Sequence, residues 1–146
     1  MTVFATAFIQ WLNFFNHDYD PNNLTTSSVK ITHASLEGAL SYPVDMALVI
    51  QKFGGTAVGD PGRIREVAEH VLRTLRRGDQ VVMVVSAMGK ETDELLRLAD
   101  DVSSTHPGRE MDMLITAGER KATALMCMAL HDLGIPADSF TGSQAG

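Results

Sequence analysis

The sequence predicts an α/β protein with a mainly parallel sheet, and three observations carry this prediction. Two short apolar runs, at residues 47–52 and 80–86, have the length and composition of strands, and residues 60–77 between them have helical periodicity. The second run holds five consecutive apolar residues, as expected of a parallel strand that is buried on both faces. For this order, a right-handed strand–helix–strand crossover is the default connection.

The predicted helix at residues 60–77 has signals at both ends. Asp60 and Pro61 suit the N-cap and the first turn, and Gly78 suits the C-terminal cap. Between these signals, apolar residues recur at three- and four-residue spacing, and Arg and Glu occupy the remaining face. This pattern indicates a helix that packs one face against the sheet.

Two further helices and a third strand are predicted downstream. Thr92 is a possible N-cap for the first helix, which stops in residues 103–105. Residues 109–133 are predicted to form a longer helix with an apolar stripe, and residues 137–141 a strand. A sheet of only three recognisable strands would leave edge groups unpaired and apolar helix faces uncovered, which favours association.

Residues 1–45 differ in character from residues 46–146. This leader is aromatic-rich and lacks clear periodicity, and its apolar run at residues 3–15 is shorter than the roughly 20 residues that span a bilayer. It has neither a basic secretory n-region nor an Arg-rich presequence. We therefore expect a foreign or poorly ordered leader ahead of one domain at residues 46–146. The alternative is an amphipathic segment that covers an apolar surface.

Size and charge narrow the function classes. A chain of 146 residues with 45% apolar and 21% charged residues suits a soluble globular domain with a sizeable core. The net charge of −6, without a Lys/Arg cluster, argues against nucleic acid as a partner, and nothing indicates a membrane partner. Cys127 is the only cysteine, and no histidine has partners at metal-ligand spacing. We expect a buried thiol, no transition metal and a cytoplasmic location.

The segment Lys52-Phe53-Gly54-Gly55-Thr56 follows the first predicted strand and has the layout of a phosphate-binding loop. Glycines let backbone N–H groups approach an anion, the next helix N-terminus adds partial positive charge, and Lys52 adds a full charge. Paired glycines at such a position are more often only a tight turn, and neither the P-loop nor the dinucleotide-binding fingerprint is present.

The crossover topology predicts what lies beside this loop. Loops that follow neighbouring parallel strands meet at the same edge of a sheet. Ser86, at the end of the second strand, should therefore lie next to Gly54 and Gly55. Two motifs roughly thirty residues apart in the sequence would then form one site.

Several motifs occur in a fixed order. They are Lys-Phe-Gly-Gly-Thr at residues 52–56, Ser-Ala-Met-Gly at 86–89, Thr-Asp-Glu-Leu-Leu at 92–96, Thr-Ala-Gly-Glu-Arg at 116–120 and Ser-Phe-Thr-Gly-Ser-Gln-Ala-Gly at 139–146. With these motifs, residues 46–146 resemble the N-terminal part of the bacterial aspartokinases, which belong to the amino acid kinase family. The resemblance implies a three-layer α/β/α sandwich of the carbamate kinase-like type with a mainly parallel sheet, here truncated.

The resemblance also implies a reaction and a set of site residues. Aspartokinases transfer the γ-phosphoryl group of ATP, bound with Mg²⁺, to the side-chain carboxylate of L-aspartate, the first step toward lysine, threonine and methionine. No tightly bound cofactor and no metal site in the protein are implied. By resemblance, the ATP phosphates would be held by Lys52, which is also the catalytic residue, and by Phe53, Gly54, Gly55 and Thr56, and aspartate by Ser86, Thr92 and Glu119.

Simpler interpretations of the aspartate-binding residues exist. Without the resemblance, Thr92 would be only a helix cap, Ser86 only a strand end, and Glu119 a solvated helical carboxylate. The sequence also departs from the family, with Ala57 where Ser is usual and Lys121 where an apolar residue is usual. We therefore expect weaker nucleotide contacts and a solvent-facing Lys121.

Members of the family continue through more of the kinase domain. We therefore expect no appreciable kinase activity from this chain alone, and we expect association as a homo-oligomer or with the missing part of a kinase. The alternative is a non-catalytic, truncated or fused phosphate-binding module that associates through exposed surface.

Overall fold

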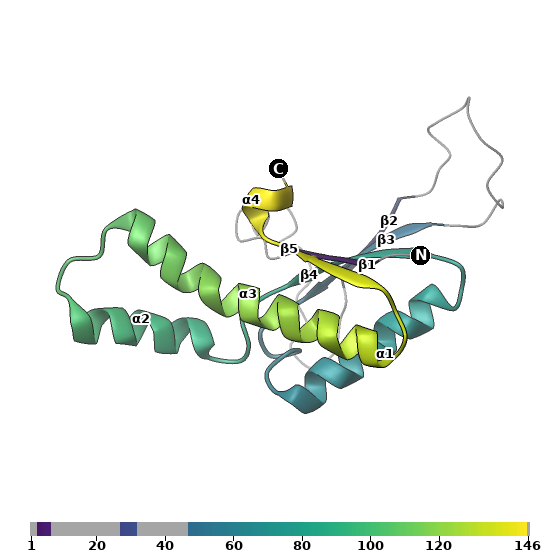
Figure 1. Cartoon of the computed structure of the whole chain (residues 1–146), viewed down its shortest axis with the longest axis horizontal. Helices are drawn as coiled ribbons and strands as arrows, with labels where there is room; N and C mark the ends of the chain where they lie inside the picture. The colour runs from purple at the N-terminus through teal and green to yellow at the C-terminus, as the bar shows by residue number, and fades with distance from the viewer. Residues whose placement is uncertain (1–2, 7–26, 32–46, 146) are drawn as a thin grey trace, which may run out of the picture.

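The computed structural model describes residues 3–6, 27–31 and 47–145. Its strands are β1 (Val3–Thr6), β2 (Ser27–Ile31), β3 (Leu48–Phe53), β4 (Gln80–Val85) and β5 (Ala137–Phe140). Its helices are α1 (Pro61–Leu75), α2 (Glu91–Val102), α3 (Gly108–Asp132) and α4 (Gly142–Ala145). The described strands form one sheet, and α1 and α3 pack together along one face of it (Figure 1).

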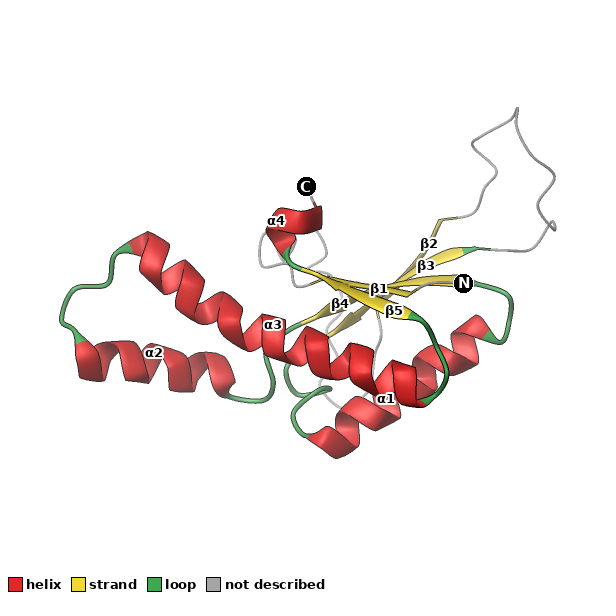
Figure 2. Ribbon diagram, in the orientation of Figure 1, coloured by secondary structure: helices red, strands yellow, loops and turns green. Residues whose placement is uncertain are grey.

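The sheet is mainly parallel, as predicted. Its order is β2-β3-β4-β1-β5, in which β2 runs antiparallel to β3 at one edge and the other neighbouring pairs are parallel (Figure 2). The register of the β3–β4 pair places Lys52 beside Val84 and Phe53 beside Val85. The chain therefore has the α/β fold expected of the amino acid kinase family, with α1 and α3 as a helical layer on the sheet.

The prediction of only three strands is wrong. The described part of the sheet has five, because β1 and β2 come from residues 1–45, where the sequence shows no clear alternation of apolar and polar residues. β1 lies between β4 and β5 and pairs with both. Most of the apolar run at residues 3–15 lies outside the described residues, and the foreign origin of the leader stays a prediction.

Helix α1 begins where its sequence signals predict. Oδ1 of Asp60 accepts a hydrogen bond from the backbone N–H of Arg63 at 3.0 Å, and Pro61 lies in the first turn. The helix ends at Leu75, two residues before the predicted end. Gly78 follows with a φ of 91°, a left-handed conformation that glycine adopts without strain. Cap chemistry at both ends therefore defines this helix.

Helix α2 begins at Glu91, one residue earlier than the sequence predicts. Lys90 is the N-cap residue and makes no side-chain capping hydrogen bond. Thr92 lies inside the first turn, so the prediction that Thr92 caps the helix is wrong. The reason is that the turn through Gly89, with a φ of 53°, already starts the helix before a polar side chain is available.

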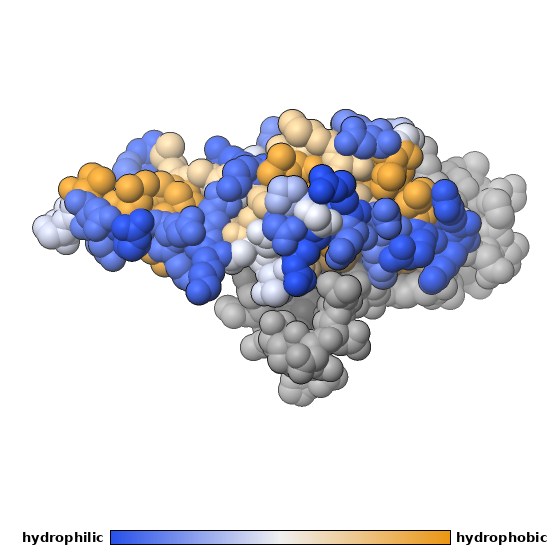
Figure 3. All heavy atoms as spheres, turned by 90° about the horizontal axis from the view of Figure 1, so that it is seen from below, coloured by the Kyte–Doolittle hydropathy of each residue, from blue (hydrophilic) through white to orange (hydrophobic). Residues whose placement is uncertain are grey.

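Helices α2 and α3 form an arm that extends beyond the sheet (Figure 1). Helix α2 has no buried residue, and the buried residues of α3 begin at Gly118. Figure 3 shows apolar side chains, in orange, along this arm. Among the described residues, no helix is both long and apolar enough to cross a bilayer.

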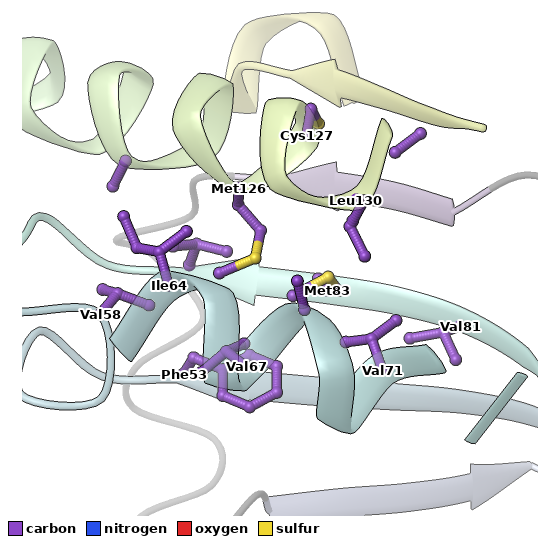
Figure 4. Packing of buried hydrophobic residues seen from close by; sticks show 14 of the residues in the cluster. Phe53, Val58, Ile64, Val67, Val71, Val81, Met83, Met126, Cys127 and Leu130 are labelled. Atoms are coloured by element: carbon purple, nitrogen blue, oxygen red, sulfur yellow. The ribbon is translucent and has the colours of Figure 1, made fainter. Parts of the chain in front are cut away.

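The core lies between the sheet and helices α1 and α3. Met83 of β4 is fully buried beneath Met126 and Leu130 of α3, which also have no exposed surface. Figure 4 shows the α1 side chains that complete this layer, namely Ile64, Val67 and Val71. Burial of side chains of this size contributes about 1.5–3 kcal/mol each. The core therefore holds α1 and α3 firmly on one face of the sheet.

Cys127 is a buried free thiol in this core, as the sequence predicts. Burial, with a smaller contribution from the charge of Asp138, raises the pKa of the Cys127 thiol. The thiol therefore stays protonated at neutral pH and acts as a small apolar side chain.

Candidate functional site

The loops after β3 and β4 are joined by backbone hydrogen bonds. The N–H of Ser86 donates to the carbonyl oxygen of Phe53 at 3.1 Å, and the N–H of Gly89 donates to the carbonyl oxygen of Gly55 at 3.0 Å. The loops meet because parallel neighbours end at the same edge of the sheet. Ser86 and the Gly54-Gly55 loop are therefore neighbours, as the crossover topology predicts.

Gly55 lies where the two loops approach most closely. A Cβ atom at Gly55 would lie 2.8 Å from the carbonyl oxygen of Ala87 and 3.1 Å from that of Gly89, which is too close for a real side chain. At Gly54, a Cβ atom would meet no described atom within 4 Å, and the residue is exposed. Packing therefore requires Gly55, whereas Gly54 leaves open space beside its backbone.

Lys52 and Ser86 lie on the sheet face opposite the helical layer. Phe53 and Val85 are register partners, and both belong to the core cluster under α1 and α3. Side chains alternate along a strand, so Lys52 and its partner Val84 point to the other face, and Ser86 falls on the same side. Both Lys52 and Ser86 are partly exposed.

Phe53 can contribute its backbone to the site but not its ring. The ring is 6% exposed and stands edge-on against His70, with ring centroids 6.2 Å apart. Ala57 N–H donates to the carbonyl oxygen of Gly54 at 2.9 Å, so the loop is also a tight turn, and Thr56 is exposed on it. The loop then leads directly into the N-terminus of α1, whose free N–H groups favour anions.

Glu119 is a buried carboxylate without a described counter-charge. It lies on the buried face of α3 and is 8% exposed. Within the described residues, no hydrogen bond or ion pair engages its carboxylate, and desolvation raises the pKa of Glu119. The interpretation of Glu119 as a solvated helical carboxylate is therefore wrong. A buried anion of this kind gains most from a cation supplied by a ligand.

Gly118 brings α3 against both the loop after β4 and the start of α2. A Cβ atom at Gly118 would lie 3.1 Å from Cβ of Ala87 and 3.2 Å from Cδ of Glu91. Each predicted aspartate-binding residue is the chain neighbour of one member of this three-way contact. These residues are Ser86, Thr92 and Glu119. The contact therefore gathers backbone from three elements that are distant in the sequence.

The sequence reasoning missed the partner of Lys121. Lys121 is about half exposed, but its Nζ lies 2.5 Å from Oε1 of Glu91, whose side chain is only 17% exposed. Oε2 of Glu91 is buried and has no hydrogen-bond partner among the described residues. The signal was a charge where an apolar residue is usual. Its partner depends on how α2 packs against α3, which periodicity does not reveal.

Comparisons with known proteins agree with this geometry. Residues 47–146 match the amino acid kinase family. The chain is 60% identical over 101 residues to an aspartokinase of Mycolicibacterium smegmatis and 57% identical over 101 residues to an aspartokinase of Corynebacterium glutamicum. Each match covers 69% of this chain and 24% of the relative. The chain thus spans about a quarter of the length of these curated relatives.

A solved structure is similar as well. The crystal structure of aspartate kinase from Synechocystis superposes with a TM-score of 0.64 at 48% sequence identity, over 66% of this chain and 16% of that one. The family match includes both joined loops, the start of α2 and the buried face of α3. On this evidence, the chain belongs to the amino acid kinase family.

Proposed function

We propose that this chain carries the phosphate-binding and aspartate-binding residues of an aspartate kinase. The aspartokinases of Mycolicibacterium and Corynebacterium support this proposal by their similarity. The observation that carries it is Glu119, a carboxylate that is 8% exposed, has no described counter-charge and follows the three-way contact at Gly118. The ammonium group of an amino acid substrate supplies the missing positive charge.

On the phosphate side, Lys52 and the backbone amides of the loop hold the oxygens of MgATP. Phosphoryl transfer depends on positioning and charge stabilisation more than on an acid or a base. Lys52 lies on the same sheet face as Ser86, and Gly54 leaves open space for a phosphate oxygen. Thr56 adds an exposed hydroxyl, and the N-terminus of α1 adds partial positive charge.

On the acceptor side, Glu119 receives the ammonium of L-aspartate, while Ser86 and Thr92 donate to its carboxylates. Thr92 lies in the first turn of α2, where free backbone N–H groups also favour an anion. An oxygen of the side-chain carboxylate then bonds to the γ-phosphorus, and the bond from that phosphorus to the β–γ bridging oxygen breaks. The products are 4-phospho-L-aspartate and ADP.

Calorimetric titration of the 146-residue chain with L-aspartate in the presence of MgATP tests this proposal. Glu119→Gln is expected to weaken L-aspartate binding by about tenfold or more, the value of a charge-assisted hydrogen bond, and to leave MgATP binding unchanged. Lys52→Ala is expected to weaken MgATP binding instead. Glu110→Gln, at an exposed position of the same helix, is the matched control. L-aspartate binding that survives Glu119→Gln would contradict the proposal.

A second candidate is a non-catalytic phosphate-binding module that associates through its surface. Exposed apolar side chains on the arm favour it, because Val102, Met113 and Met128 are 79%, 59% and 60% exposed. Sedimentation velocity of the double variant Val102→Gln and Met113→Gln should then show less self-association than the parent chain. Ser104→Gln, in the loop between α2 and α3, is the control. A parent chain that stays monomeric at all concentrations contradicts this candidate.

A further inference from the structure

The Glu91–Lys121 ion pair differs from the other ion pairs of the described residues. Arg63–Asp60, Arg97–Asp101 and Arg109–Glu110 join positions at most four residues apart, and their side chains are mostly exposed. The Glu91–Lys121 pair instead bridges two helices, and its carboxylate is only 17% exposed. It is therefore the described ion pair best able to fix one helix relative to another.

Helix α2 needs such a contact because it has little other anchorage. It has no buried residue, so core packing does not set its orientation. Its first turn is held by backbone bonds from Glu91 N–H to the carbonyl oxygen of Met88 at 2.9 Å and from Glu94 N–H to that of Lys90 at 3.0 Å. These bonds shape the turn, but they do not connect it to α3.

Gly118 makes the bridge between the helices possible. Cγ and Cδ of Glu91 lie 3.3 Å and 3.2 Å from the position that a Gly118 Cβ would occupy, so the Glu91 side chain crosses α3 at its glycine. From there its Oε1 reaches Lys121, one turn further along α3. The aliphatic part of Glu91 is thus packed while its charge is paired.

We propose that Glu91 and Lys121 are positioning residues that hold the first turn of α2 at a fixed place on α3, and thereby set the spacing between Thr92 and Glu119. Thr92 follows Glu91 directly, and Glu119 lies two residues before Lys121. The effect on substrate rests on the aspartate-binding roles proposed above. The attachment of α2 to α3 does not, and it is testable without a ligand.

Amide hydrogen exchange of the full chain, followed by NMR, tests the attachment. Lys121→Met is expected to accelerate exchange of the Glu94 amide by about three- to fivefold, the size of effect that a partly exposed ion pair supports. Lys121→Arg should restore the parent rate, because it keeps the charge. Arg97→Met removes an ion pair within α2 and is the matched control, with no change expected at Glu94.

L-aspartate titration of the same variants tests the effect on the site. Lys121→Met should weaken L-aspartate binding by about three- to fivefold while MgATP binding stays unchanged, and Lys121→Arg should restore it. Unaltered exchange at Glu94 in Lys121→Met would overturn the proposal whatever the ligand does. A parent chain that binds no L-aspartate would instead contradict the proposed function, and the exchange result would still decide the role of the ion pair.

Discussion

At the scale of single residues, Glu119 links stability to ligand binding. Its carboxylate is buried without a described partner, so the folded chain holds a group that would be better solvated in the unfolded one. A binding site for a cation has this property before the ligand arrives. The same residue should therefore cost stability and provide affinity.

Glu119→Gln is expected to stabilise the chain at neutral pH. Desolvation raises the pKa of Glu119 above its unfolded value of about 4.3. The stability that Glu119 contributes is therefore present below about pH 4 and lost as pH rises through the folded-state pKa. The neutral amide avoids that loss, worth about 1 kcal/mol. Urea unfolding at pH 4 and pH 8 measures it, and a gain confined to pH 4 would contradict this account.

Gly55→Ala and Gly54→Ala form a matched pair. The Cβ of Gly55→Ala would press on backbone oxygens of Ala87 and Gly89, so we expect a loss of about 1–3 kcal/mol of unfolding free energy. Gly54→Ala meets no described atom and should leave stability nearly unchanged, while it weakens MgATP binding if phosphate lies there. Thermal unfolding and calorimetry compare the two variants. Equal stability losses would rule out the close approach at Gly55.

At the scale of elements, the N-cap of α1 is a defined contribution to stability. Asp60→Ala removes the hydrogen bond to Arg63 N–H and should cost about 1 kcal/mol. Urea unfolding monitored by circular dichroism measures the change. Glu69→Ala, at an exposed position inside the same helix, is the control, and we expect no loss there. A similar loss in both variants would assign the effect to charge instead of capping.

The elements that the sequence predicted well have strong local signals. Strands β3 and β4 are continuous apolar runs, and α1 and α3 have both a period and end signals, so local reasoning located them within about two residues. Strands β1 and β2 have no such pattern, and their places in the sheet depend on pairing with distant strands. The start of α2 was missed because backbone conformation at Gly89 determines it.

The candidate site was predictable to the same extent. The meeting of the Gly55 loop with Ser86 follows from topology, which the order of elements already implies. The burial of Glu119 and the pairing of Lys121 with Glu91 depend on helix rotation and on contacts between helices. Such contacts have no signature in a single sequence without a known partner.

At the scale of the whole molecule, residues 1–45 enter the sheet through β1, which has a strand on each side. Ala5 pairs with Met83 of β4 and with Ser139 of β5. Proline in an interior strand removes a ladder hydrogen bond, so Ala5→Pro should lower the unfolding free energy by about 3 kcal/mol. Equilibrium unfolding in urea measures this loss.

Ser104→Pro is the control for that experiment. Ser104 lies in the loop after α2, and the preceding Ser103 already has φ −151° and ψ 142°, which a following proline tolerates. We expect little change in its unfolding free energy. If Ala5→Pro is equally harmless, β1 does not take part in the sheet in solution, and the foreign-extension hypothesis for residues 1–45 gains support.

The alternation of Lys52 and Phe53 along β3 has a consequence for misfolding. A slip of one residue between β3 and β4 would turn the ammonium of Lys52 into the apolar interior and expose the aromatic ring of Phe53 to water. No mispaired form can keep the core and lose only the ligand site. Selection for a tightly packed interior therefore also guards the chemistry on the far side of the same strand.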